Sequence, residues 1–214
     1  MFKKFEGFTE AFPKDEPIQP PSGILAFCRH YTRGFEKPLL LLGLMSMTIA
    51  IIEVALFGYM GQLVDWLSTS NKETFLADNQ STLIGLGVLL LVIMPVMIAI
   101  YSLLLHQTLL GNYPMSIRWL AHRYLLKQSL SFYQDDFAGR VATKVMQTSL
   151  AVRETVTKMV DVFVYVTVYF TAMLFMLAES DWRLMAPMLI WLFVYVGIQL
   201  HFVPKLKDVS SEQA

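Results

Sequence analysis

The stretch from Thr82 to Leu105 reads TLIGLGVLLLVIMPVMIAIYSLLL and holds no charged residue in 24 positions. A helix that crosses a lipid bilayer needs about 20 predominantly apolar residues. This stretch therefore predicts a membrane-spanning helix, and Pro95 within it is expected to bend that helix. The composition agrees, because 16% of the chain is charged, whereas soluble domains carry about 25% charged residues.

Three more apolar tracts accompany this one. Pro38 to Val64 contains a single charged residue, Glu53, and the tracts Val162–Ala178 and Leu184–Leu200 contain none. Buried helices of a soluble protein are the alternative for the last two, because each has 17 residues. The four spans are expected at about residues 38–66, 82–110, 160–179 and 183–203. We therefore predict an all-α polytopic membrane protein, with four transmembrane helices and long cytoplasmic helical extensions.

The composition also excludes several classes of function. Seventeen Lys and Arg residues balance seventeen Asp and Glu residues, so the net charge gives no indication of nucleic-acid binding. Cys28 is the single cysteine and cannot form an intrachain disulfide. Neither a metal-ligand cluster nor a Ser–His–Asp set outside the membrane is found in the sequence. No metal site and no catalytic residues are therefore predicted.

The basic residues predict the orientation of the chain. The segment between the second and third spans carries Arg118, Arg123, Lys127, Arg140, Lys144, Arg153 and Lys158. The connections between the first and second spans and between the third and fourth spans have one basic residue each, Lys72 and Arg183. Because cytoplasmic loops are enriched in Lys and Arg, both termini and residues 112–160 are expected in the cytoplasm. The expected location is the plasma membrane, or the inner membrane of a bacterium.

Residues 1–37 are expected to form a cytoplasmic N-terminal lead. They lack the short apolar core and small-residue cleavage site of a signal peptide, and they contain a proline-rich stretch from Pro13 to Pro21. Two readings remain open for Gly23 to Tyr31. These residues form either a short interfacial helix with Ile24 and Leu25 on its apolar side, or part of a flexible tail.

Residues 112–160 have the pattern of a helical hairpin. Apolar residues follow a pattern built largely on spacings of three and four in both arms, at Ile117, Leu120, Ala121, Tyr124, Leu125 and Leu130, and at Val141, Val145, Leu150, Val152 and Val156. Between the arms, the aromatic and acidic stretch Ser131–Gly139 indicates a turn. Arms of about 20 residues reach roughly 30 Å from the bilayer. Such a stalk is typical of a membrane machine that receives force from a soluble motor.

Residues 132–153, FYQDDFAGRVATKVMQTSLAVR, resemble the first intracellular loop of type I ABC exporters. That family commonly has Phe-Phe-Asp, four variable positions, Gly, an apolar–Ser–Arg–apolar step, an Asn-Asp pair and Val-Arg. The matching positions are Phe132, Tyr133, Gly139, Val141, Lys144, Val145, Val152 and Arg153. Gln134 replaces the usual acid, and Gln147-Thr148 replaces the Asn-Asp pair. Gly61–Asp65 and Asp181–Leu184 are also similar to family patterns, so the resemblance covers about residues 35–210.

The resemblance implies that residues 38–214 are part of an ABC transmembrane domain. A transmembrane domain of this family has six spans. Two such domains and two nucleotide-binding domains form the working transporter. A coupling helix is implied around Tyr133 to Gly139, with the candidate contact residues Phe132, Tyr133, Asp135, Asp136 and Gly139. A capped helical turn without a partner is the alternative. Because only four spans are predicted, the chain is expected to be the N-terminal two thirds of one transmembrane domain.

No Gly-x-x-x-x-Gly-Lys-[Ser/Thr] phosphate loop occurs in the sequence. No ATPase site and no cofactor are therefore predicted for this chain, and ATP and Mg²⁺ are implied only for a nucleotide-binding domain outside it. The implied partners are the lipid bilayer, that domain and a second transmembrane half, either identical or different. The implied function is the permease part of an exporter of lipid or amphipathic, drug-like compounds. The alternative is a stand-alone tetraspan scaffold with residues 112–160 as its docking arm.

Ionisable groups within the spans are candidates for a substrate path, because charge at membrane depth is costly. Glu53 lies in the middle of the first span. It either lines an aqueous cavity, where it meets a cationic substrate or a proton, or makes an interhelical hydrogen bond that fixes packing. His106 and Gln107 end the second span and are interfacial or substrate-path residues. Asp161 lies near the cytoplasmic boundary, where pairing at a helix end explains it.

Overall fold

The computed structural model describes residues 2–69, 79–135 and 138–212, and these residues form helices and loops without a strand. Four helical stretches are long and apolar enough to cross a membrane, namely Glu36–Ser68, Gln80–Leu125, Gly139–Ser180 and Trp182–Lys207. The predicted all-α architecture with four spans is therefore confirmed. The division of the chain into a lead and a partial domain stays a prediction.

The second span is built from several helical pieces. In chain order they are α5 (Gln80–Val88), η1 (Leu89–Ile93), α6 (Met94–Leu103) and η2 (Leu104–Leu110), followed by α7 (Asn112–Leu125). Both η1 and η2 are wider, π-helical turns. Pro95 follows η1 directly and lacks an N–H group, and its ring crowds the carbonyl group of Leu91. The wider turn at η1 accommodates this proline inside a continuous span.

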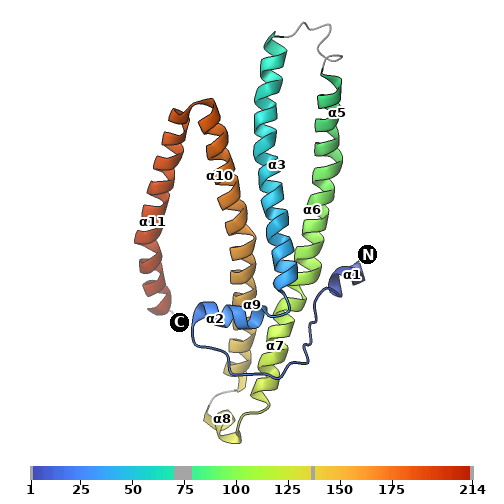
Figure 1. The fold of residues 1–214 in the computed structure, drawn as a ribbon. Helices are drawn as coiled ribbons and strands as arrows, with labels where there is room; N and C mark the ends of the chain where they lie inside the picture. The colour runs from blue at the N-terminus through green and yellow to red at the C-terminus, as the bar shows by residue number, and fades with distance from the viewer. Residues whose placement is uncertain (1, 70–78, 136–137, 213–214) are drawn as a thin grey trace.

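The other elements complete two helical hairpins. The first span is α3 (Glu36–Thr69), which is preceded by α1 (Phe2–Glu6) and α2 (Ile24–Thr32). The remaining elements are α8 (Leu130–Asp135), α9 (Ala138–Val160), α10 (Val162–Ser180), η3 (Trp182–Leu184) and α11 (Met185–Glu212). Figure 1 shows α10 and α11 as one hairpin, while α7 and α9 extend past the base of α3 to α8 at the far tip. The short tip helix α8 begins at Leu130, three residues before the coupling helix that the resemblance implies around Tyr133 to Gly139. Helix α9 begins at Ala138.

The buried core lies at the base of α3, where η2, α7 and α9 meet it. Its members are Phe35, Leu39, Leu42, Leu104, Leu109, Tyr113, Ile117 and Val152. The rings of Phe35 and Tyr113 stack with their centroids 4.7 Å apart. Gly43 lies just above, where a Cβ atom would come within 3.2 Å of Val160 Cγ1, so glycine permits this close approach. In contrast, Leu91 of η1 is 79% exposed and Phe193 of α11 is 75% exposed, as suits helices that face lipid.

Residues 7–23, called the N-terminal strap, run beside α7 rather than away from the protein (Figure 1). The Asn112 side-chain amide donates hydrogen bonds to Glu6 O at 2.9 Å, to Thr9 O at 3.2 Å and to Thr9 Oγ1 at 3.0 Å. Further along, Trp119 Nε1 donates to Pro13 O at 3.1 Å. Backbone carbonyl groups of the strap are thus held by side chains of α7.

Replacing Asn112 with alanine is expected to loosen the start of the strap. The substitution removes two N–H donors that are shared among three acceptors, and a net loss of about 1–2 kcal/mol corresponds to roughly tenfold faster local opening. Amide hydrogen exchange of residues 6–15 measures this change, with the exposed neighbour Met115→Ala as the control. Exchange as slow as in the unsubstituted chain would show that these bonds do not hold the strap.

Candidate functional site

Glu53 belongs to α3, the first span, and contacts α10 in the third span. Its side chain is half-buried, and its Oε2 accepts a hydrogen bond from the hydroxyl group of Tyr165 on α10. Among the described residues, the other oxygen, Oε1, makes no hydrogen bond. The bond links two helices, as one of the two readings of the sequence expects, and it leaves one carboxylate oxygen available to a further partner.

Asp161 lies between α9 and α10 and links three spans. Its Oδ1 accepts a hydrogen bond from Ser46 Oγ of α3 at 2.5 Å, and its Oδ2 accepts one from Tyr101 Oη of α6 at 2.6 Å. The sequence places Asp161 at a helix end near the membrane boundary. The structure shows that its half-buried carboxylate also joins neighbouring helices, and the two donors offset the cost of removing a carboxylate from water.

Two adjoining cavities of about 320 Å³ each flank the Glu53–Tyr165 bond. The first, called the Asp161 cavity, is lined by Ser46, Ile49, Glu53, Ile98, Tyr101, Asp161, Val162 and Tyr165. The second, called the Phe57 cavity, is lined by Glu53, Leu56, Phe57, Met60, Tyr165 and Tyr169. Glu53 and Tyr165 therefore border both cavities.

The lining of these cavities suits a basic, partly apolar molecule. The rings of Tyr165 and Tyr169 stack with centroids 5.8 Å apart and an interplanar angle of 22°. Aromatic faces attract cations, most strongly where water is excluded, and the Glu53 carboxylate adds a negative charge beside them. Phe57 and Met60 supply apolar surface for the rest of such a molecule. Each cavity is near the lower end of the roughly 300–1,000 Å³ range of small-molecule pockets.

His106 and Gln107, the other two intramembrane candidates, lie on η2 and do not line either cavity. The His106 side chain is exposed, and its Nδ1 lies 2.9 Å from Ser102 O on the preceding turn. Gln107 is half-buried. Their place on a substrate path stays a prediction, and the structure does not bring them to Glu53.

Phe132 and Tyr133 lie on α8, at the tip of the hairpin (Figure 1). Each side chain is 37% exposed, and the two rings meet edge to face with centroids 5.3 Å apart. Tyr133 Oη donates a hydrogen bond to Leu125 O at 2.6 Å, which fastens α8 to the end of α7. Of the other tip candidates, Gly139 is exposed in the first turn of α9, whereas the side chain of Asp135 and the whole of Asp136 lie outside the described residues.

Comparison with known proteins decides the family. The family described as ABC transporter transmembrane region matches residues 39–214, which is most of the chain. The chain belongs to this family. An uncharacterized ABC transporter ATP-binding protein of Haemophilus influenzae is 40% identical to it over 216 residues, covering 100% of this chain and 35% of that protein. The chain thus spans about a third of that relative's length, and no solved structure matches it.

As a member of the ABC transporter transmembrane family, the chain is an integral membrane domain, and its four apolar stretches are suited to cross the bilayer. The family resemblance found in residues 132–153 is confirmed. The roles of individual residues are not decided by membership, so Glu53, the tip residues and the η2 pair remain predictions.

Sequence reasoning missed three residues of the site, Ser46, Tyr101 and Tyr165. Part of the signal was present, since Ser46 lies seven positions before Glu53 and Tyr165 lies four positions after Asp161. Both spacings place the pair on one face of a helix. The partner of each face depends on how α3 packs against α10, which no single-helix pattern reveals.

Proposed function

We propose that this chain is the permease part of an ATP-driven ABC exporter that moves lipid-like or amphipathic compounds carrying a basic group. Its motor is a nucleotide-binding domain that contacts α8, and both termini and the hairpin tip face the cytoplasm. Support for this orientation comes from the basic residues of the 112–160 segment. Support for the motor comes from the family and from the Haemophilus influenzae relative, which is named as an ABC transporter ATP-binding protein.

One observation carries the proposal: the helix that borders the Glu53 cavities continues to the tip. Asp161 N donates to Thr157 O at 2.8 Å, and Tyr165 N donates to Asp161 O at 2.9 Å, so the hydrogen-bond ladder runs from α9 into α10. A stiff helix transmits displacement along its axis. Movement of α8 would therefore shift Asp161 and Tyr165 relative to Ser46 and Glu53, the residues on α3 that they bind.

A displacement of this kind changes the site chemically. The Glu53 carboxylate accepts the hydrogen bond from Tyr165, and the same carboxylate would attract a bound cation. When the Tyr165–Glu53 bond lengthens, the carboxylate can turn toward either cavity, and exposure to water weakens its attraction for the cation. Substrate release would thus follow from the motion of the helix, without any reacting group in this chain.

Photocrosslinking from the tip tests the proposed motor contact. A photoreactive phenylalanine in place of Phe132 is expected to yield crosslinked peptides from a nucleotide-binding domain when the assembled transporter is irradiated in membranes. Phe163, which is 62% exposed on α10, is the matched control position and is expected to give no such peptide. Crosslinks from position 132 to other proteins only would favour the docking arm of a tetraspan scaffold.

A further inference from the structure

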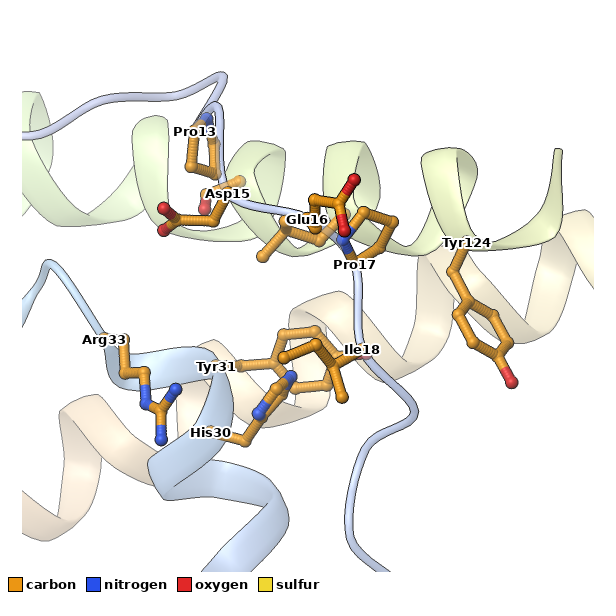
Figure 2. Close-up of a pocket in the computed structure, with 11 residues that line it drawn as sticks. Pro13, Asp15, Glu16, Pro17, Ile18, His30, Tyr31, Arg33 and Tyr124 are labelled. Atoms are coloured by element: carbon orange, nitrogen blue, oxygen red, sulfur yellow. The ribbon is translucent and has the colours of Figure 1, made fainter. Parts of the chain in front are cut away.

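A third cavity, called the strap cavity, lies outside the spans. It has a volume of about 310 Å³ and is lined by residues of the N-terminal strap, α2 and α7 and by Arg33, which follows α2. Figure 2 shows Asp15 and Glu16 on the strap, with His30 of α2 and Arg33, which directly follows α2, across the gap. Ser116, Leu120 and Tyr124 of α7 form the remaining wall.

The strap cavity carries opposite charges on opposite walls. Asp15 lines the cavity from the strap, Arg33 lines it from the opposite side directly after α2, and both residues are exposed (Figure 2). Within the described residues, neither of these two groups has an oppositely charged partner at ion-pair distance, whereas Glu16 faces Lys127 at 3.9 Å. Burial, and to a smaller extent Arg33, lowers the pKa of His30, which favours the neutral imidazole. A neutral imidazole has one N–H donor and one acceptor nitrogen, and Arg33 supplies the positive charge.

The walls are held in place by contacts outside the cavity. Arg123 Nη1 donates to Asp15 O at 2.9 Å and to Pro13 O at 3.3 Å, which fixes the backbone of the strap wall. On the other side, the hydroxyl groups of Thr32 on α2 and Tyr113 on α7 lie 2.8 Å apart and share a hydrogen bond, which joins the α2 wall to α7. Because both walls are fixed, a ligand would meet a preformed site and pay little ordering entropy.

The cavity lies next to the place where the first span begins. Helix α2 leads through a short turn into α3, and Gly34 in that turn has φ of 85°. Ile24 and Leu25 of α2 are 80% and 83% exposed. Exposed apolar side chains on a short helix beside a span are suited to the boundary between lipid headgroups and acyl chains. Lipid headgroups are thus the ligands available at this level.

We propose that the strap cavity binds the headgroup of an aminophospholipid. The phosphate group lies against Arg33 and His30, because a guanidinium binds phosphate through paired hydrogen bonds. The primary ammonium group lies against Asp15. An anionic headgroup without an amine would leave Asp15 facing a negative charge, and a simple cation would leave Arg33 unpaired.

Native mass spectrometry of the assembled transporter in detergent tests the headgroup site. Phosphatidylethanolamine is expected to bind about tenfold more tightly than phosphatidylglycerol, in line with one charge-assisted hydrogen bond. Asp15→Asn and Arg33→Gln should each remove this preference. Arg29→Gln on the same helix and Glu10→Gln on the same strap do not line the cavity and should retain it. Circular dichroism confirms that each variant is folded.

Three results would overturn the proposal. Equal binding of the two lipids would show that the amine is not recognised. Unchanged preference in both Asp15→Asn and Arg33→Gln would place the lipid elsewhere on the chain. Free phosphoethanolamine that binds as tightly as the lipid would show that the ligand is a soluble phosphate–amine compound rather than a membrane component.

Discussion

Replacing Tyr133 with alanine is expected to separate ATP hydrolysis from transport in the assembled transporter. The substitution removes an aromatic side chain that is 37% exposed at the tip and the hydrogen bond to Leu125 O that fastens α8. Aromatic anchors in the centre of an interface often contribute about 2 kcal/mol or more. We therefore expect transport to fall about tenfold or more, with ATPase activity retained, in parallel assays of flux and phosphate release.

Two controls separate the contributions of Tyr133. Tyr133→Phe keeps the ring and loses only the bond to Leu125 O, so it should retain most transport if the ring contacts the motor. Leu150→Ala changes a side chain of equal exposure, 37%, on α9 away from the tip, and should leave coupling unchanged. Full coupling in Tyr133→Ala would show that α8 is a helical turn without a motor contact.

Replacing Glu53 with glutamine is expected to weaken the binding of a lipophilic quaternary ammonium compound about tenfold. Glutamine has nearly the same shape and can still accept the hydrogen bond from Tyr165, so the main loss is the negative charge. A permanent cation is the appropriate probe because it carries no exchangeable proton. If Glu53 bound only protons and no cationic substrate, Glu53→Gln would not change the affinity for this probe. Fluorescence titration of the transporter in nanodiscs measures the dissociation constant.

Tyr165→Phe is the matched variant for Glu53→Gln. It keeps the aromatic ring of both cavities and loses the hydrogen bond to Glu53, so cation binding should be retained or strengthened. A purely structural role of Glu53 gives the opposite pattern. In that case Glu53→Gln and Tyr165→Phe would both lower thermal stability, and neither would alter the affinity for the cation.

The helical architecture was predictable because membrane spans depend on local composition. The uncharged run from Thr82 to Leu105 is sufficient by itself to indicate a span, and the spacing of apolar residues after Ile117 indicates the helical extension. Glu53 was also predictable as a special residue, because it is the one charge within its tract. All of these signals lie within a single helix.

The contacts between helices were not predictable in the same way. The sequence explains Asp161 by its place at a helix end, whereas its bonds to Ser46 and Tyr101 exist only because α3, α6 and the junction of α9 and α10 converge. The N-terminal strap gives a similar case. Trp119 binds a backbone carbonyl group of Pro13, and backbone acceptors are the same for every residue type, so the strap has no pattern that reveals its partner.

The most direct measurement is ATP-dependent uptake of a fluorescent lipophilic amine into inside-out vesicles that contain the assembled transporter. The expected result is accumulation with ATP, none with a non-hydrolysable analogue, and at least about tenfold slower accumulation for Glu53→Gln, because the cavity charge is lost. ATP hydrolysis without any accumulation of amphipathic compounds, or accumulation unaffected by both Glu53→Gln and Tyr133→Ala, would contradict the proposed permease.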